Sequence, residues 1–252
     1  MTTAHNAPSR HPLAEGIFAI SGGLLWLERT RSLIAADVHL GYEEVIGGAL
    51  PLWSTSPSVD TLLDAAKACA AQEIVLLGDI IHGAVLSRGA QSRISGALAA
   101  LRDCARVELI AGNHEGRSRG VAVLGATHEC LVRDDWLLMH GDRPTLNGRA
   151  IIGHLHPSIH LGGDESVPVF LASDRLIVVP ALTPYSRGLD VRSNDCMFAL
   201  EAWDLRSKDM KVVAASPRLF DLGKLSALRS DHYGAAPSSG RRYSRKFLQP
   251  DR

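Results

Sequence analysis

The feature that most constrains this chain is the apolar run at residues 74–77, which leads directly into Gly78-Asp79. An unbroken apolar run of this length predicts a strand that is buried on both faces. A carboxylate at the end of such a strand loses contact with water, which costs free energy unless positive charge or hydrogen bonds compensate. A Gly-Asp pair alone is most simply a turn, so its chemistry must be judged from the rest of the chain.

Four further segments place polar side chains of metal-ligand type directly after an apolar stretch. The predicted strands in question cover residues 32–36, 107–110, 136–139 and 150–152. The polar residues that follow them are Asp37 and His39, Asn113 and His114, His140, and His154 and His156. Each segment taken alone is also explained by an ordinary turn or edge strand. Coincidence is a poor explanation for five such segments in series.

The order of predicted elements indicates an α/β fold with a parallel or mixed sheet. Strands alternate with helices in the first half, so consecutive strand ends point the same way. Ligand sites in such sheets lie at the carboxyl ends of the strands, where Asp37, Asp79 and Asn113 stand. Apolar spacing predicts helices over residues 57–72 and 90–103, and further strands over 16–20, 24–28, 129–132, 167–171, 176–179, 197–203 and 211–214.

Length and composition are typical of one α/β domain with short appendages. The chain has 252 residues, of which 46% are hydrophobic. We predict a flexible N-terminal segment over residues 1–15, the domain over 16–215, and a C-terminal extension with a basic end over 216–252. Four scattered cysteines without a Cys-x-x-Cys pair are typical of a reduced cytosolic protein. Without a signal sequence or an apolar run of membrane length, we predict a cytoplasmic protein with no membrane contact.

The charge is unevenly distributed along the chain. Residues 241–252 carry five basic side chains against one acidic one, which leaves 22 basic and 26 acidic side chains in the first 240 residues. A body with this net charge of −4 gives no general electrostatic case for nucleic-acid binding. The basic end either attracts nucleic acid locally or is a solvated terminus. The loop at 42–56 either borders a substrate site or is packed down by Trp53.

The residue types in the five segments predict two metal ions. Carboxylate and amide oxygens combine with imidazole nitrogens and no thiolate, which suits Mn²⁺, Fe or Zn better than Mg²⁺ or Ca²⁺, and we expect Mn²⁺ first. This set is too large for one ion but sufficient for two ions that share a carboxylate. Two ions roughly 3.5–4 Å apart clamp both oxygens of a phosphoryl transfer and lower the pKa of bound water.

Taken as a set, the five segments resemble the motifs of the calcineurin-like metallophosphoesterase superfamily. The resemblance covers residues 32–160 and implies a sandwich of two mixed β-sheets flanked by helices, a four-layer αββα arrangement. The matching segments are Asp37-Val38-His39, Gly78-Asp79, Gly112-Asn113-His114-Glu115, His140-Gly141 and Gly153-His154-Leu155-His156.

The resemblance also implies a role for each residue. One metal ion would be held by Asp37, His39 and His156. The other would be held by Asn113, His140 and His154, with Asp79 as the bridge. His114 would not be a ligand but would stabilise the transition state and protonate the leaving alkoxide. His82 matches a histidine of SbcD-type DNA-repair nucleases and either orients His114 or is a simple turn histidine.

A smaller group, the DNA-ligase-associated metallophosphoesterases, is also similar. Its implied setting is DNA repair, with DNA as substrate and a DNA ligase and a helicase as partners. This chain departs from that group at Thr183-Pro184-Tyr185-Ser186-Arg187, where the group is rich in glycine and phenylalanine. The segments that carry the similarity are residues 36–43, His140-Gly141-Asp142, residues 153–157 and Gly188-Leu189-Asp190-Val191.

We therefore predict a dinuclear metal-dependent phosphoesterase that hydrolyses phosphodiester bonds in nucleic acid. One alternative is an enzyme for cyclic nucleotides or phosphomonoesters, favoured by the negatively charged body. The other is a non-catalytic metal-binding scaffold. Arg143 and Arg187 are the cations nearest the motifs, and they either hold phosphate oxygens or are plain surface arginines. The sequence indicates no particular oligomeric state.

Overall fold

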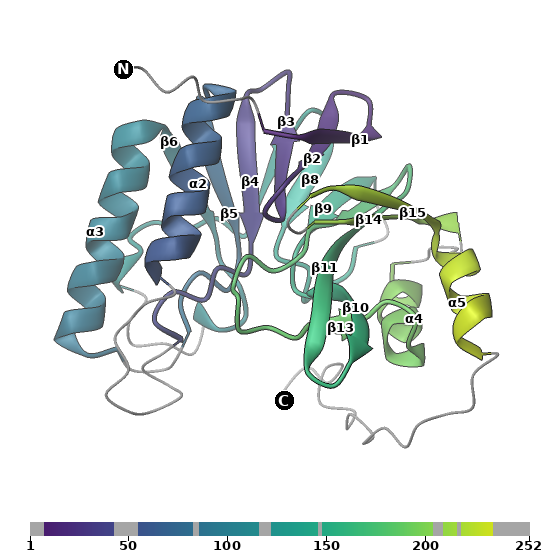
Figure 1. The fold of residues 1–252 in the computed structure, drawn as a ribbon. Helices are drawn as coiled ribbons and strands as arrows, with labels where there is room; N and C mark the ends of the chain where they lie inside the picture. The colour runs from purple at the N-terminus through teal and green to yellow at the C-terminus, as the bar shows by residue number, and fades with distance from the viewer. Residues whose placement is uncertain are drawn as a thin grey trace, which may run out of the picture.

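Two β-sheets pack face to face and carry helices on both outer faces (Figure 1). The four-layer αββα sandwich that the sequence resemblance implies is confirmed. The structure is a computed structural model, and it describes residues 8–42, 55–82, 86–115, 122–145, 148–203, 209–215 and 218–233.

The first sheet places three parallel strands next to one another. Its order is β1-β2-β3-β4-β5-β6. Antiparallel pairing joins β1 to β4 in series, whereas β4, β5 and β6 are parallel. The carboxyl ends of these three strands therefore lie at one edge of the sheet. The strands are β1 (Arg10–Ala14), β2 (Ile17–Ile20), β3 (Leu24–Leu27), β4 (Ser32–Ala36), β5 (Glu73–Leu77) and β6 (Arg106–Ile110).

Strand β5 shows why its sequence is apolar without alternation. Ile74 and Leu76 pack in the core beneath helices α2 (Thr55–Cys69) and α3 (Arg88–Cys104), whereas Val75 and Leu77 pack in the core between the two sheets. Because successive side chains of a strand point to opposite faces, a strand covered on both faces needs apolar residues throughout. The prediction of a doubly buried strand is confirmed.

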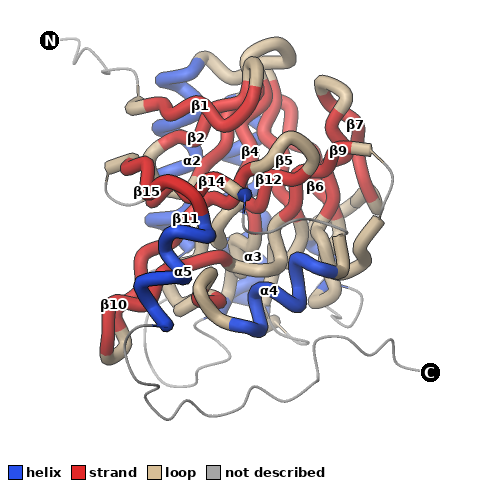
Figure 2. The backbone as a smooth tube through the Cα atoms, turned by 90° about the vertical axis from the view of Figure 1, so that its right-hand side faces the viewer, coloured by secondary structure: helices blue, strands red, loops and turns tan. Residues whose placement is uncertain are grey.

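The second sheet is also mixed and carries the other two helices. Strands β8, β9 and β12 are parallel, and the order along the main path is β13-β10-β11-β12-β9-β8-β7, with β14 paired to β11 and β15 to β14. Helices α4 (Asn194–Glu201) and α5 (Leu225–Tyr233) lie in front of the strands in Figure 2. The strands are β7 (Cys130–Arg133), β8 (Trp136–Met139), β9 (Arg149–Ile152), β10 (Pro157–Gly162), β11 (Glu165–Ala172), β12 (Leu176–Val178), β13 (Leu189–Asp190), β14 (Lys211–Ala214) and β15 (Phe220–Lys224).

The strand predicted over residues 197–203 is wrong, because most of this segment belongs to helix α4. Ser193 caps the helix by accepting a hydrogen bond from the backbone N–H of Cys196 at 3.1 Å. The buried residues Cys196 and Leu200 are four apart, one helical turn, and both face the second sheet. A short apolar run does not distinguish a strand from a buried helix, and the serine cap was the available signal. No helix in the described ranges is long and apolar enough to cross a membrane.

Ordered elements of the structure fall inside both segments predicted to flank the domain. Strand β1 lies inside the segment 1–15, predicted to be flexible, and pairs with β2. Strand β15 and helix α5 lie inside the predicted extension 216–252; β15 pairs with β14 and Leu225 is buried. These are edge elements whose partners are chosen by tertiary packing, so local patterns did not reveal them. The basic end 241–252 and most of the 42–56 loop, including Trp53, lie outside the described residues.

Glu73 connects the two sheets at the amino end of β5. Its side chain is only 2% exposed. Arg133 of β7 binds both carboxylate oxygens, with Nε 2.9 Å from Oε2 and Nη2 2.8 Å from Oε1. Arg106 Nη2 and Ser32 Oγ each donate to the same carboxylate at 2.6 Å. Burial acts to raise the pKa of Glu73, but Arg133, Ser32 and Arg106 outweigh it and lower the pKa to about 2.

We expect Glu73→Gln to lower the free energy of unfolding at pH 7 by about 3 kcal/mol, because two arginines lose a buried partner. Since the folded pKa lies below the ordinary value of 4.5, the stabilisation is complete above pH 4.5 and disappears as the pH falls toward 2. Urea unfolding at pH 7, 4 and 3 should show the gap between wild type and variant narrowing. A gap that stays constant would contradict this assignment. The exposed Glu201→Gln serves as control.

Candidate metal centre

The ends of five strands, drawn from both sheets, meet at one place. Asp37 follows β4, Asp79 follows β5 and Asn113 follows β6, whereas His140 follows β8 and His154 follows β9. The backbone N–H of His154 donates to Asp37 Oδ2 at 2.8 Å, a hydrogen bond that crosses between the sheets. The structure thus brings the predicted ligand residues of the two sheets together.

Asp37, His39 and His156 form the first group. One ligand atom from each of them lies within 4.8 Å of the others. Asp37 is fully buried, and its Oδ1 lies 3.3 Å from His156 Nε2. The other ring nitrogen of His156, Nδ1, forms a 2.7 Å hydrogen bond with Ser186 Oγ. Ser186 therefore holds the ring with Nε2 directed at the carboxylate.

Asp79, His140 and His154 form the second group, again with donor atoms within 4.8 Å of one another. His140 Nε2 is 3.0 Å from His154 Nδ1 and 3.5 Å from Asp79 Oδ2. The side-chain oxygen of Asn113 joins them, because its Oδ1 is 3.0 Å from His140 Nε2. Two nitrogens and two oxygens thus converge on one point.

Asp79 lies between the two groups. Its Oδ2 is 4.0 Å from His39 Nε2 in the first group and 3.5 Å from His140 Nε2 in the second. Its Oδ1 accepts a hydrogen bond of 3.0 Å from the backbone N–H of His114. One carboxylate oxygen is thereby held by the backbone while the other faces both groups.

The unpartnered buried atoms and the donor chemistry of the site fit metal cations. Among the described residues, Asp37 Oδ1 and His140 Nδ1 are buried without a hydrogen-bond partner, and they lie 3.6 Å apart. A buried carboxylate oxygen without a partner is costly unless positive charge compensates it. Carboxylate, amide and imidazole donors are the set that Mn²⁺, Fe and Zn accept.

The backbone around the site is held in an unusual conformation. Five of the candidate ligand residues, none of them glycine, have positive φ angles between 43° and 63°: Asp37, His39, Asp79, His154 and His156. Such conformations cost about 1–3 kcal/mol each and persist only where the surroundings enforce them. Gly78, at φ 64°, lies so close to His140 that a side chain there would overlap the imidazole ring.

Burial favours the neutral form of two of these imidazoles, those of His39 and His154. It lowers the pKa of His39 to about 3, opposed by Asp37 and assisted by the neighbouring His156, His82 and His114. Burial and His140 together lower the pKa of His154. For His156 burial acts in the same direction, but the Asp37 carboxylate outweighs it and the pKa is raised. Neutral imidazole is the form that binds a metal ion.

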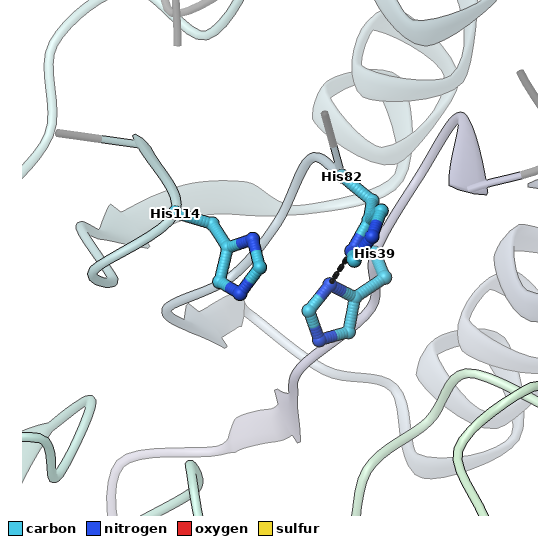
Figure 3. A group of neighbouring side chains, drawn as sticks. All are labelled: His39, His82 and His114. Carbon is cyan, nitrogen blue, oxygen red and sulfur yellow. Dashed lines mark hydrogen bonds between the residues drawn. The ribbon is translucent and has the colours of Figure 1, made fainter. Parts of the chain in front are cut away.

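His82 and His114 stand beside the first group (Figure 3). His82 Nδ1 forms a 2.9 Å hydrogen bond with His39 Nδ1, and its ring centre is 5.0 Å from that of His114. His82 therefore contacts both His39 and His114, but it forms its hydrogen bond with His39. His114 is 40% exposed and points its Nε2 toward Asp79 Oδ2 at 3.7 Å.

The two arginines predicted to bind substrate contact nearby groups of the protein. Arg143 is 87% exposed and pairs with its neighbour Asp142 at 3.7 Å. Arg187 donates from Nη2 to the backbone carbonyl of Gly163 at 2.6 Å. The hydrogen bond from Arg187 supports the turn between β10 and β11. For both arginines, binding of a phosphate oxygen stays a prediction.

Glu115 is the supporting residue that the sequence analysis missed. It is buried, and its carboxylate accepts four backbone N–H groups: Oε1 from Ile80 and Ile81, and Oε2 from Asp79 and Gly112. Burial raises the pKa of Glu115, against the effect of these hydrogen bonds. Its place directly after Asn113 and His114 was a usable signal. No comparable signal existed for Ser186, which is 30 residues from His156.

We expect Glu115→Gln to lower the free energy of unfolding by about 2–4 kcal/mol, because the amide group leaves two buried N–H donors unpaired. Since those donors shape the turn that carries Asp79, metal affinity should also fall, by roughly 10–100-fold. Urea unfolding and titration with Mn²⁺ measure the two effects. The exposed Glu129→Gln is the matched control. Unchanged metal affinity in Glu115→Gln would mean that Glu115 serves stability alone.

The fold is shared with a known nuclease. The solved structure of the nuclease MPE from Pseudomonas putida superposes with a TM-score of 0.66 at 18% sequence identity, over 85% of this chain and all of that chain. No family model matches the sequence, and no curated protein matches it. The chain thus has a metallophosphoesterase-like fold, with clustered histidines and aspartates where the strand ends of both sheets converge.

Proposed function

We propose that this protein is a dinuclear metal-dependent phosphoesterase that hydrolyses phosphodiester bonds in nucleic acid. The observation that carries the proposal is the position of Asp79, whose Oδ2 faces His39 of one ligand group and His140 of the other. A single carboxylate between two complete donor groups is the arrangement that a two-metal centre requires. The fold likeness to a nuclease supports the substrate class.

In this proposal Asp37, His39 and His156 hold one ion, and Asn113, His140 and His154 hold the other, with Asp79 shared. Two divalent ions, Mn²⁺ in the first instance, would supply positive charge for the phosphoryl oxygens and would acidify the attacking water. The protein contributes fixed donor atoms in a buried site, so little reorganisation is needed during the reaction.

His114 is proposed to be the catalytic acid. Water attacks phosphorus, the bond from phosphorus to the leaving oxygen breaks, and that oxygen takes a proton from the His114 imidazolium. The ring is suited to this because it is partly exposed at the edge of the site, while its backbone N–H is anchored to Asp79. The products are a phosphomonoester and an alcohol.

His82 is proposed to position His39. When His39 carries its proton on Nδ1 and donates it to His82, the lone pair of His39 Nε2 is free to bind an ion. Burial and His114 lower the pKa of His82, so His82 is neutral and able to accept this hydrogen bond. His82 is therefore proposed as a positioning residue, whereas His114 is proposed as the catalytic acid.

A small-molecule substrate, such as a cyclic nucleotide, is the second candidate. It is favoured by the net charge of −4 over the first 240 residues, which would repel a polyanion. Hydrolysis of bis-p-nitrophenyl phosphate and of a labelled single-stranded oligonucleotide, both with Mn²⁺, separates the two candidates. Cleavage of the small diester alone would favour the second. Bound metal without any turnover would favour a scaffold role.

More broadly, we propose that the protein acts in DNA repair together with a DNA ligase and a helicase.

Asp79→Asn should lose metal as well as activity, because one carboxylate serves both ion sites. We expect hydrolysis of bis-p-nitrophenyl phosphate to fall by more than about 100-fold. Metal analysis after gel filtration should find fewer than the two ions per chain expected for wild type. Asp142→Asn, a neighbouring carboxylate outside the two ligand groups, is the matched control. Full metal content in Asp79→Asn would contradict the shared role.

His114→Ala should keep both metal ions and lose turnover. We expect losses of about 10²–10⁴-fold for oligonucleotides, whose alkoxide leaving group needs a proton, and much smaller losses for bis-p-nitrophenyl phosphate, whose leaving group does not. The exposed His128→Ala controls for removal of an imidazole. Equal losses on the two substrates would mean that His114 stabilises charge but does not donate the proton.

A further inference from the structure

A cavity of about 600 Å³ lies beside the metal centre, between the β10–β11 hairpin and residues 184–187. This volume is within the range of small-molecule sites, about 300–1,000 Å³. Leu161 and Tyr185 supply its large apolar side chains and are 64% and 42% exposed. Both side chains are therefore accessible to a molecule that enters the cavity.

The cavity is linked to the metal centre by direct contacts. Ser186 lines the cavity and also bonds to the ligand His156. Tyr185 stacks on Tyr42, with ring centres 5.0 Å apart and an angle of 22°. Tyr42 in turn contacts the ring of His82 at 4.4 Å. Aromatic rings therefore run without interruption from the histidines of the centre to the wall of the cavity.

The net negative charge of the side chains that line the cavity disfavours a phosphate group and favours a neutral ring. Two carboxylates, those of Asp164 and Glu165, line the cavity against one guanidinium, that of Arg187, which donates one hydrogen bond to the carbonyl of Gly163. An anion would meet two carboxylates there. A nucleobase, by contrast, is flat and uncharged, stacks on tyrosine, and offers amino groups to carboxylate acceptors.

We propose that this cavity binds an unpaired base of a nucleic-acid strand whose neighbouring phosphate is cleaved. Tyr185 is the stacking platform, and Tyr42 supports the ring from its other side. The inference rests on the proposed function and narrows its substrate to single-stranded or locally unpaired nucleic acid. Stacking of one base on an aromatic side chain contributes roughly 5- to 150-fold in affinity, or about 1–3 kcal/mol.

The first test compares substrates with and without bases. Tyr185→Leu keeps apolar bulk but removes the ring, so kcat/KM should fall by roughly 5- to 150-fold for a single-stranded oligonucleotide and far less for bis-p-nitrophenyl phosphate. Tyr185→Phe should retain the activity of wild type on the oligonucleotide. Phe198→Leu, at an exposed aromatic of α4, is the control. Equal losses on both substrates would overturn the base site.

The second test is a double-mutant cycle between protein and substrate. A single abasic position is moved along the oligonucleotide. At one position near the cut, wild type should lose about as much kcat/KM as Tyr185→Leu loses on the intact strand. The abasic site and the substitution combined should then cost little more than either alone. Additive losses at every position would overturn the proposal.

A binding measurement separates this inference from the proposed function. A strand with 2-aminopurine at the identified position should lose fluorescence on binding wild type and Tyr185→Phe but not Tyr185→Leu. Quenching without hydrolysis of any diester would contradict the phosphoesterase and leave the base site standing. Hydrolysis of the oligonucleotide with equal fluorescence in all three proteins would contradict the base site and leave the phosphoesterase standing.

Discussion

Two carboxylates with almost no access to water are the constraint on which this structure depends. Asp37 is fully buried and Asp79 is 3% exposed, and both stand at the ends of parallel strands. Like charges in a medium of low polarity repel one another and cost desolvation energy. The chain compensates part of this with backbone N–H groups from His154 and His114. The oxygens left over, Asp37 Oδ1 and Asp79 Oδ2, face the imidazoles, and this residual charge is what divalent cations would neutralise.

Rigid surroundings make such an arrangement possible. The positive φ angles at Asp37, Asp79 and His154 are tolerated because these residues follow β4, β5 and β9, strands that are paired on both sides. Glu115 adds four hydrogen bonds to the turn after β5 and the backbone before Asn113. The apolar core between the sheets and the Glu73–Arg133 contact at the opposite end of β5 hold the two sheets in a fixed position relative to each other. Donor atoms supplied by different sheets thereby keep fixed distances.

The surroundings of the centre are not uniform. One side is closed by the core, where His140 is only 2% exposed. The other opens through His114 and His82 toward Tyr42, Tyr185 and the adjoining cavity. Among the described residues, this open side carries the exposed histidine and the aromatic stack. Chemistry and recognition would be divided between residues that lie on strand ends and residues that lie on the segment around Tyr185.

The sequence by itself determined strands β2 to β6, helices α2 and α3 and the seven candidate ligands, because each depends on a local pattern. For strands and ligands the pattern is an apolar run followed by a polar end, and for the helices it is an apolar stripe. Local pattern failed where the context decides, as in α4, whose short apolar run was compatible with a strand, and in β1 and β15, which pair as edge strands. Only the tertiary structure placed Ser186 against His156, Glu115 under the β5 turn, and the guanidinium of Arg187 on the carbonyl of Gly163. Those contacts join segments that are tens of residues apart in the sequence, and their geometry is set by how neighbouring strand ends and loops pack against one another.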